Sequence, residues 1–311
     1  MRQTRLALLG WYQRVQRDLP WRRTRDPYAI WVSEIMLQQT RVAAVIPYYE
    51  KFLMAFPNPA ALAAASEERV LAIWAGLGYY SRARNLHKAA KDVQQLGQFP
   101  DSIEEIRKLS GVGDYTAAAI ASIAFGLPHA AVDGNVKRVL ARLTASENDL
   151  RESADRLLDR HDPGRWNQAL MELGATICLP REPHCDACPV ARFCAAKIAG
   201  RQHEFPAKRA KAPPVRLKRI LLLIQRRNRI LLRPGTRVRG FWDLPEPFDS
   251  ARIGPVLATF RHTITFRHYE FEFRGATAAS IPADYRWFAE NELHQVALST
   301  VAKKALRGIA G

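Results

Sequence analysis

Cysteine is scarce in this 311-residue sequence and is confined to one short stretch. The spacing of the cysteines is Cys-x6-Cys-x2-Cys-x5-Cys, at Cys178, Cys185, Cys188 and Cys194. Because the sequence has no cysteine elsewhere, these four are not ordinary small core residues. Four thiols within one loop indicate either a metal site or a pair of disulfides.

Long apolar runs are also missing. The sequence has no stretch of about 18 apolar residues, so we predict no membrane-spanning helix and no membrane partner. The apolar run 6–9 is too short for a signal peptide, and Trp11, Tyr12 and Gln13 replace the small residues of a cleavage site. We therefore expect a cytoplasmic protein, associated with a bacterial-type nucleoid.

Disulfides are rare in the cytoplasm, which favours a metal as the partner of the four cysteines. Zinc sites usually combine two distant Cys-x2-Cys pairs, or one such pair with histidines. Here the single pair, Cys185 and Cys188, is flanked by two lone cysteines. That compact arrangement favours one cubane iron–sulfur cluster with a thiolate at each corner, and zinc is the alternative.

Acidic residues are outnumbered by basic ones. The sequence has 30 Asp and Glu against 47 Lys and Arg, a formal net charge of +17. Such a surplus indicates a polyanionic partner, above all nucleic acid, because neutralised phosphates release their counterions. A charged, solubilising surface is the alternative explanation. The length indicates two domains, and we find no solenoid-type repeat.

Hydrophobic periodicity divides the chain into three parts. Residues 1–200 show the 3.6-residue period of helices, residues 201–216 form a basic linker that contains proline, and residues 217–311 predict a small α+β domain. In the last part, two strands flank the turn 226–228, residues 269–274 alternate as in a half-buried strand, and 298–309 predicts a helix. The helices of the first part are expected at 5–17, 27–39, 43–55, 67–75, 82–96, 102–109, 115–125, 135–143 and 166–177.

The segment 109–117 combines a helix end, two glycines and a new helix start. Gly111, Val112 and Gly113 form its centre. Glycines let the backbone approach a ligand closely, and the free amides at the next helix start suit a phosphate. This pattern predicts a helix-hairpin-helix that grips the DNA backbone. An ordinary turn between two helices is the alternative, and Asp114 would repel a nearby phosphate.

Two carboxylates stand out further along this part. Glu34 lies inside an apolar helix, and such surroundings raise the pKa of a carboxyl group toward neutrality, as a general acid needs. An exposed glutamate on the outer face of the helix is the alternative. Asp133 precedes a basic amphipathic helix, and its residues alone favour an N-cap over a catalytic role. The segment 74–85 interleaves glycines, aromatic residues and arginines, which suits either insertion into stacked bases or a buried core.

These motifs together resemble the MutY-type adenine DNA glycosylases of the endonuclease III superfamily. The resemblance rests on residues 33–40 (Ser-Glu-Ile-Met-Leu-Gln-Gln-Thr), the Gly-Leu-Gly-Tyr-Tyr stretch at 76–80, Gly-Val-Gly at 111–113, Val-Asp-Gly-Asn at 132–135 and the cysteine loop. It covers residues 11–198 almost continuously. It implies a helix-hairpin-helix glycosylase fold: a six-helix barrel against a helical domain with a [4Fe-4S] cluster on the four cysteines.

The resemblance also implies roles for single residues. Glu34 would protonate the flipped-out adenine at N7, and Asp133 would stabilise the oxocarbenium-like sugar. Asn135 and Tyr115 would position these groups. Residues implied in contacts with duplex DNA are Trp21, Arg22, Gln38, Gln39, Thr40, Tyr79, Gly111, Val112, Gly113 and Lys137.

Tyr115 narrows the reaction. Bifunctional relatives carry a lysine here, whose amine forms a Schiff base with the sugar, and tyrosine does not form one. We therefore expect a monofunctional enzyme that hydrolyses the N-glycosidic bond of adenine opposite 8-oxoguanine or guanine, and that acts as a monomer. The alternatives are a thymine or uracil mismatch glycosylase of the same superfamily and a non-enzymatic iron–sulfur protein that binds DNA.

The last part of the chain resembles the Nudix-like domain of the same glycosylases. Residues 240–246 begin like a Nudix element, but Gly254 and Pro255 stand where its Arg-Glu would be, so pyrophosphate hydrolysis is not expected. The resemblance implies a domain, 217–311, that recognises the base opposite adenine. His262 and Thr265 are its predicted DNA contacts, although the family's Phe-Ser-His loop is replaced by Ile-Thr-Phe at 264–266.

Overall fold

The computed structural model describes residues 1–207, 213–236, 240–264, 266–294 and 296–308. The chain divides into two compact units, Met1–Ala65 with Ser81–Arg209 and Ser66–Tyr80 with Ala210–Gly311. The first unit is helical, and the second joins a short helical segment to two small sheets. In the described part of the chain, every helix is too short or too polar to span a lipid bilayer.

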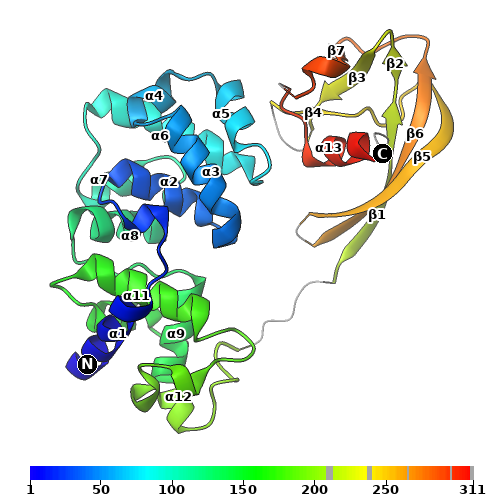
Figure 1. Cartoon of the computed structure of the whole chain (residues 1–311). Coiled ribbons are helices and arrows are strands. Elements are labelled where there is room, and N and C mark those ends of the chain that lie inside the picture. Colours follow the sequence, from blue (N-terminus) through cyan, green and yellow to red (C-terminus); the bar gives the residue numbers. More distant parts are fainter. Residues whose placement is uncertain (208–212, 237–239, 265, 295, 309–311) are drawn as a thin grey trace. The chain divides into compact units, whose positions relative to one another are not determined.

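The helices of the first unit lie close to their expected positions and form two groups (Figure 1). Three short helices, α4, α10 and α12, are additions to the expected set. The bounds are α1 (Arg2–Val15), α2 (Pro27–Leu37), α3 (Val42–Ala55), α4 (Pro59–Ala64), α6 (Tyr80–Leu96), α7 (Ile103–Lys108), α8 (Asp114–Phe125), α9 (Gly134–Thr144), α10 (Leu150–Leu157), α11 (Pro163–Thr176) and α12 (Ala195–Ile198).

One group of helices is built around α2, which is apolar along most of its length. Residues 28–36 of α2 are all buried, and the helix packs against α3 and α8. Its start is fixed by Asp26, whose carboxylate accepts hydrogen bonds from the backbone amides of Tyr28 and Ala29, and by Pro27 at the first helical position. The apolar face of α8 is buried as well, over residues 116–122.

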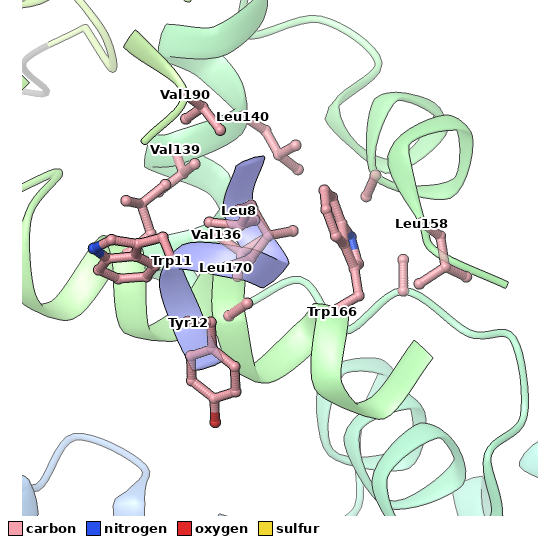
Figure 2. Packing of buried hydrophobic residues seen from close by; sticks show 14 residues of the cluster. Leu8, Trp11, Tyr12, Val136, Val139, Leu140, Leu158, Trp166, Leu170 and Val190 are labelled. Carbon is pink, nitrogen blue, oxygen red and sulfur yellow. The ribbon is translucent and has the colours of Figure 1, made fainter. Parts of the chain in front are cut away.

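The other group contains α1, α9, α10 and α11, which surround a common core (Figure 2). Trp11 of α1 lies beside Val139 of α9 in the same buried cluster as Val136 and Leu170, whereas the ring of Tyr12 points away from these residues. Because these residues recur every three or four positions, each helix buries a single stripe, and the burial of large apolar side chains holds the group together.

Helix α11 connects the two groups. Its Gly164 lies directly on α8, because a Cβ there would stand 2.6 Å from the carbonyl oxygen of Ser122. The Asn167 side chain accepts a hydrogen bond from the amide of Ala131 (3.1 Å) and donates to Ser122 Oγ and to the carbonyl of His129 (both 2.8 Å). The buried Asn167 of α11 therefore connects the segment between α8 and α9 to α8 and α11.

The second unit is α+β, as its pattern predicts. Strand β1 (Val215–Leu223) pairs in parallel with β6 (Arg267–Ala278), and β6 pairs antiparallel with β5 (Ala251–Ile264) as a long curved ribbon (Figure 1). The other sheet has the order β2–β3–β4 with β7 beside β3. Its strands are β2 (Gln225–Arg226), β3 (Arg229–Pro234), β4 (Trp242–Asp243) and β7 (Arg286–Ala289).

Helix α13 (Thr300–Arg307) closes the apolar core of this unit. Its residues Val301, Ala302 and Ala305 belong to the same buried cluster as Phe271 and Phe273 of β6. The predicted turn between β2 and β3 is confirmed, with positive φ angles at Arg227 and Asn228, as a tight two-residue hairpin requires.

The positions where a Nudix element would carry Arg-Glu lie in a strand. Gly254 and Pro255 lie inside β5, next to two register shifts against β6. An edge strand tolerates proline and bulges, because its outer amides have no ladder partner. Gly254 and Pro255 are therefore accommodated in the edge strand β5.

The segment Ser66–Tyr80, with α5 (Glu67–Trp74), belongs to the second unit. The sequence shows no sign of this, because the segment lies between helices of the first unit. Within it, the indole nitrogen of Trp74 donates to the carbonyl of Gly78 (3.0 Å).

Candidate active site

A cavity of about 800 Å³ opens in the helical unit. Its walls come from α2, α8, α9 and α11 and from the segments that precede α2 and α3. All four predicted catalytic and positioning residues and five of the predicted DNA contacts line it together: Trp21, Arg22, Glu34, Gln38, Gln39, Thr40, Tyr115, Asp133 and Asn135. Side chains as distant in the chain as Trp21 and Asn135 thus share one site.

Glu34 is buried in the apolar wall of this cavity, only 5% exposed, so the outward-facing alternative is wrong. The hydroxyl of Tyr115 donates a hydrogen bond to its Oε2 at 2.6 Å. Burial raises the pKa of Glu34 to about 7, and the charge of Asp133 raises it further, while the Tyr115 hydrogen bond and Arg22 oppose the shift. A group with this pKa can both hold and give up a proton at neutral pH.

Asp133 occupies a different environment, at the N-cap of α9. Its Oδ1 accepts from the amide of Val136 (2.6 Å), and its Oδ2 accepts from the side-chain amide of Asn135 (3.3 Å). Two donors and the N-terminus of a helix interact favourably with a negative carboxylate. The N-cap role and the place in the cavity wall therefore belong to one residue, and the sequence posed them as alternatives.

Asn135 is held in turn by Arg138, which the sequence analysis did not single out. The Arg138 guanidinium donates to Asn135 Oδ1 (2.8 Å), to the carbonyl of Gly174 (2.8 Å) and to the carbonyl of Cys178 (2.9 Å). Gly174 lies so close that a Cβ there would stand 2.8 Å from the Cβ of Asn135. The N-terminus of α9 is therefore linked directly to the start of the cysteine loop.

A buried ion-pair cluster forms another part of the cavity wall. Glu172 of α11 accepts hydrogen bonds from Arg17 (2.6 and 2.9 Å) and from Arg22 (2.7 Å). Burial alone would raise the pKa of Glu172, but the hydrogen bonds from both arginines outweigh burial and hold the pKa below its usual value. Trp21 lies beside this cluster and packs edge-on against Tyr49. Pairs so distant in sequence leave no local pattern, so Glu172 was missed.

The helix-hairpin-helix is formed by α7 and α8. Gly111 adopts φ +80°, and the amide of Val112 bonds to the carbonyl of Leu109 (3.0 Å). Gly111 and Gly113 are exposed, so their backbone is open to a ligand. Asp114 forms an ion pair with Arg107 (3.0 Å), which reduces the repulsion that its charge would exert on a phosphate.

The remaining predicted DNA contacts lie elsewhere. Lys137 is exposed on α9. Tyr79 belongs to the second unit, with φ +51° and a side chain that is 48% exposed. His262 lies on β5 opposite Tyr269 of β6, and Thr265 lies outside the described residues.

The four cysteines are free thiols, each half-buried. The pKa of Cys188 is raised to about 11, mainly by burial, and the charges of Cys178, Cys194 and Cys185 contribute to the rise. The thiol of Cys194 donates to the carbonyl of Arg142 at 3.2 Å. The Arg142 guanidinium donates to the Cys178 sulfur at 3.3 Å. Among the described residues, no three His, Cys, Asp or Glu side chains converge as ligands of a single ion. In a cubane cluster each thiolate binds a different iron, so the four sulfurs lie farther apart than the ligands of a single ion do.

Comparisons with known proteins agree with this geometry. Residues 32–161 match the family described as "HhH-GPD superfamily base excision DNA repair protein". The "Adenine DNA glycosylase" of Homo sapiens is 35% identical over 407 residues, which cover 98% of this chain and 73% of the relative.

Solved structures match the helical unit. "Structure of a thermostable thymine-DNA glycosylase" aligns with a TM-score of 0.60 at 30% identity, over 64% of this chain and 98% of that one. "Structure of a Trapped Endonuclease III-DNA Covalent Intermediate: Estranged-Adenine Complex" aligns with a TM-score of 0.56 at 23% identity, over 64% of this chain and 96% of that one. The second similarity shows the fold alone.

Proposed function

The chain belongs to the adenine DNA glycosylases of the HhH-GPD superfamily, enzymes of base excision repair, and we propose that it hydrolyses the N-glycosidic bond of adenine opposite 8-oxoguanine or guanine. The observation that carries the proposal is one cavity with two carboxylates in opposite environments, Glu34 in an apolar wall and Asp133 at a helix N-terminus. The adenine has to leave the base stack to reach that cavity.

Glu34 is the proposed general acid. Adenine is a poor leaving group as an anion, and a proton at N7 makes it a neutral one. With a pKa of about 7, Glu34 carries a proton in a large share of molecules at neutral pH. The short hydrogen bond from Tyr115 holds the carboxyl group in one orientation, which supports transfer of that proton to a base positioned in the cavity.

Asp133 is the proposed electrostatic stabiliser. As the glycosidic bond breaks, positive charge develops on the sugar, and a nearby carboxylate lowers the energy of that state. Asn135 fixes the position of Asp133 by donating to its Oδ2. Water then completes hydrolysis, because Tyr115 offers no amine for a Schiff base.

The four cysteines would hold a [4Fe-4S] cluster, one thiolate to each iron. The contacts of Arg142 with the sulfurs of Cys178 (3.3 Å) and Cys194 (3.2 Å) fit this group, because they bring two of the four sulfurs to one residue and a buried cation stabilises thiolates. When bound, the cluster cross-links the ends of the loop 178–194. Loss of one ligand, as in Cys185→Ser, should lower iron content and DNA affinity before it lowers the rate of bond cleavage, which single-turnover kinetics and iron analysis would measure. A folded, tightly binding but inactive Cys185→Ser enzyme would contradict this role.

Duplex DNA is the proposed partner along the basic surface, with the hairpin 111–113 and Lys137 on its backbone. The second unit, through His262 and Thr265, is proposed to recognise the base opposite adenine. We propose a monomer in the cytoplasm.

One assay tests the proposed function. Duplexes with A opposite 8-oxoguanine, A opposite guanine and T opposite guanine are incubated with excess enzyme and then cleaved with alkali. We expect adenine release from the first two, faster or with higher affinity for 8-oxoguanine, and no adduct after borohydride treatment. Thymine release would favour the alternative function, a thymine glycosylase, which the similarity to the thermostable thymine-DNA glycosylase supports. Equal rates and affinities for the two adenine mispairs would refute 8-oxoguanine recognition.

A further inference from the structure

Residues 38–40, between α2 and α3, form a short loop at the rim of the cavity, here named the rim loop. Gln39, at its centre, is exposed and has φ +55°. A non-glycine residue pays a conformational penalty in this left-handed region, so surrounding contacts have to hold it there. The contacts that hold Gln39 in this conformation therefore set the position of the rim loop toward DNA.

Arg82 of α6 supplies most of these contacts. Its NH1 donates to the carbonyls of Ile35 and Met36 (both 2.9 Å) and also to that of Gln38, and its NH2 donates to Thr40 Oγ1 at 3.2 Å. The last carbonyls of a helix have no partner within the helix, and here one guanidinium takes several of them at the end of α2. Arg82 is only 8% exposed, so water does not compete for these carbonyls.

Further bonds complete the arrangement. The Gln38 side chain donates to Thr116 Oγ1 of α8 at 3.3 Å, and the amide of Thr40 donates to the carbonyl of Leu37 at 3.2 Å. Both neighbours of the exposed Gln39 are thus bonded to Arg82. Gln38 accepts through its carbonyl and Thr40 accepts through its hydroxyl.

The same face of α6 also contacts the hairpin. Asn85 lies three positions after Arg82, so the two side chains are neighbours on the helix. A Cβ at Gly111 would stand 2.7 Å from the Cβ of Asn85, so the hairpin backbone lies directly on this side chain. One turn of α6 therefore contacts both loops to which DNA binding is assigned.

We propose that Arg82 is a positioning residue that fixes the rim loop relative to the hairpin, so that Gln39 and the hairpin meet the duplex in one register. This inference rests on the proposed function. It assigns Arg82 no contact with the adenine and no part in proton transfer.

The test is a double-mutant cycle with Arg82→Lys and Gln39→Ala in the full chain. Kd is measured with a duplex that carries a 2′-fluoro analogue of adenosine opposite 8-oxoguanine, which resists hydrolysis, and the single-turnover rate is measured with the same duplex carrying ordinary deoxyadenosine. Lysine keeps the charge but not the planar fork that reaches several carbonyls. We expect Arg82→Lys to raise Kd about tenfold, as the misplacement of a binding loop does, with the single-turnover rate at saturating enzyme nearly unchanged. In the Gln39→Ala background, Arg82→Lys should raise Kd no further, because the contact it positions is already lost.

Arg5→Lys is the matched control. Arg5 also bonds two helix-end carbonyls, those of Leu157 and Arg156 (both 2.9 Å), but it lies outside the cavity wall. It should lower the melting temperature and leave Kd unchanged. Thr40→Val, which removes the hydroxyl that accepts from Arg82 and donates to the carbonyl of Gln38 (3.3 Å), should raise Kd about threefold and, again, only where Gln39 is present.

The outcomes separate the two proposals. A wild-type enzyme that releases no adenine refutes the proposed function. A wild-type enzyme that releases adenine, with the same fold-rise in Kd on Arg82→Lys in both backgrounds, refutes the positioning role and leaves the function intact. An Arg82→Lys enzyme with unchanged Kd refutes it too.

Discussion

The two carboxylates of the cavity differ in what surrounds them. Glu34 lies in the buried stretch of α2, and the structure gives it one strong partner, the hydroxyl of Tyr115. Asp133 lies at the polar start of α9, where amides bind it and where Arg138 links its partner Asn135 to the cysteine loop. Desolvation keeps a proton available on one side of the cavity, and donors favour negative charge on the other. The same carboxyl group therefore suits two chemical tasks, because the helices that carry Glu34 and Asp133 differ.

Glu34→Gln should have the largest effect. The amide fits the same space but cannot donate a proton to the base as an acid, so we expect the single-turnover rate to fall about 10³-fold with DNA affinity retained. Glu104→Gln, on the exposed first turn of α7, is the control and should act like the wild type. A Glu34→Gln enzyme with a nearly normal rate would show that Glu34 is not the general acid.

Asp133→Asn comes next. Asparagine is also a good N-cap, so the melting temperature should change little, while loss of the charge should lower the single-turnover rate about 10²-fold. Asp162→Asn is the matched control, because Asp162 caps α11 by accepting from the amide of Arg165 (3.2 Å). If both variants lose stability alike and neither loses rate, Asp133 is only a cap.

Gly174→Ala tests the support behind Asp133. The added Cβ would press on the Cβ of Asn135, displacing the donor to Asp133, and we expect about a tenfold lower rate. The midpoint of the pH profile should stay near that of the wild type, because Glu34 is untouched. Gly10→Ala on α1, whose added Cβ would meet only the end of Arg14 at 3.8 Å, should leave both quantities unchanged.

Tyr115→Phe should have the smallest effect on rate but a clear one on pH dependence. Protonated Glu34 is the active form, so the rate falls as pH rises through its pKa of about 7. The Tyr115 hydrogen bond lowers that pKa, so its removal should raise the pKa and move the basic limb of the profile to higher pH. A basic limb that stays in place, or moves to lower pH, would show that the profile does not report Glu34.

Much of the helical unit could be predicted from the sequence, because its helices carry local capping residues and a clear apolar period. Asp26 and Pro27 mark the start of α2, and the apolar period continues to its end. The short helix α4 was missed since six residues carry too little of a period, although Asn58 caps it. The length of β5 was missed because Gly254 and Pro255 interrupt strands in most settings and are tolerated here at an edge.

The candidate site was predictable where a residue acts within a local motif and not where it acts through distant pairing. Glu34 and Asp133 stand in recognisable segments. Glu172 gains its meaning only from Arg17 and Arg22, and Arg138 from carbonyls of the cysteine loop, contacts that a linear pattern does not contain. Packing of the chain, rather than residue type, selects these arginines from the 47 basic residues.

Asn167 has a consequence for how the enzyme and its substrate share the work of engagement. Its side-chain amide, on α11, holds the segment that connects α8, which carries Tyr115, to α9, which begins at Asp133. The spacing between Tyr115 and Asp133 in the cavity is thus set by hydrogen bonds within the protein. If adenine enters the cavity as proposed, we expect the nucleic acid to supply most of the conformational change, and a base of the wrong shape to be rejected because it does not fit.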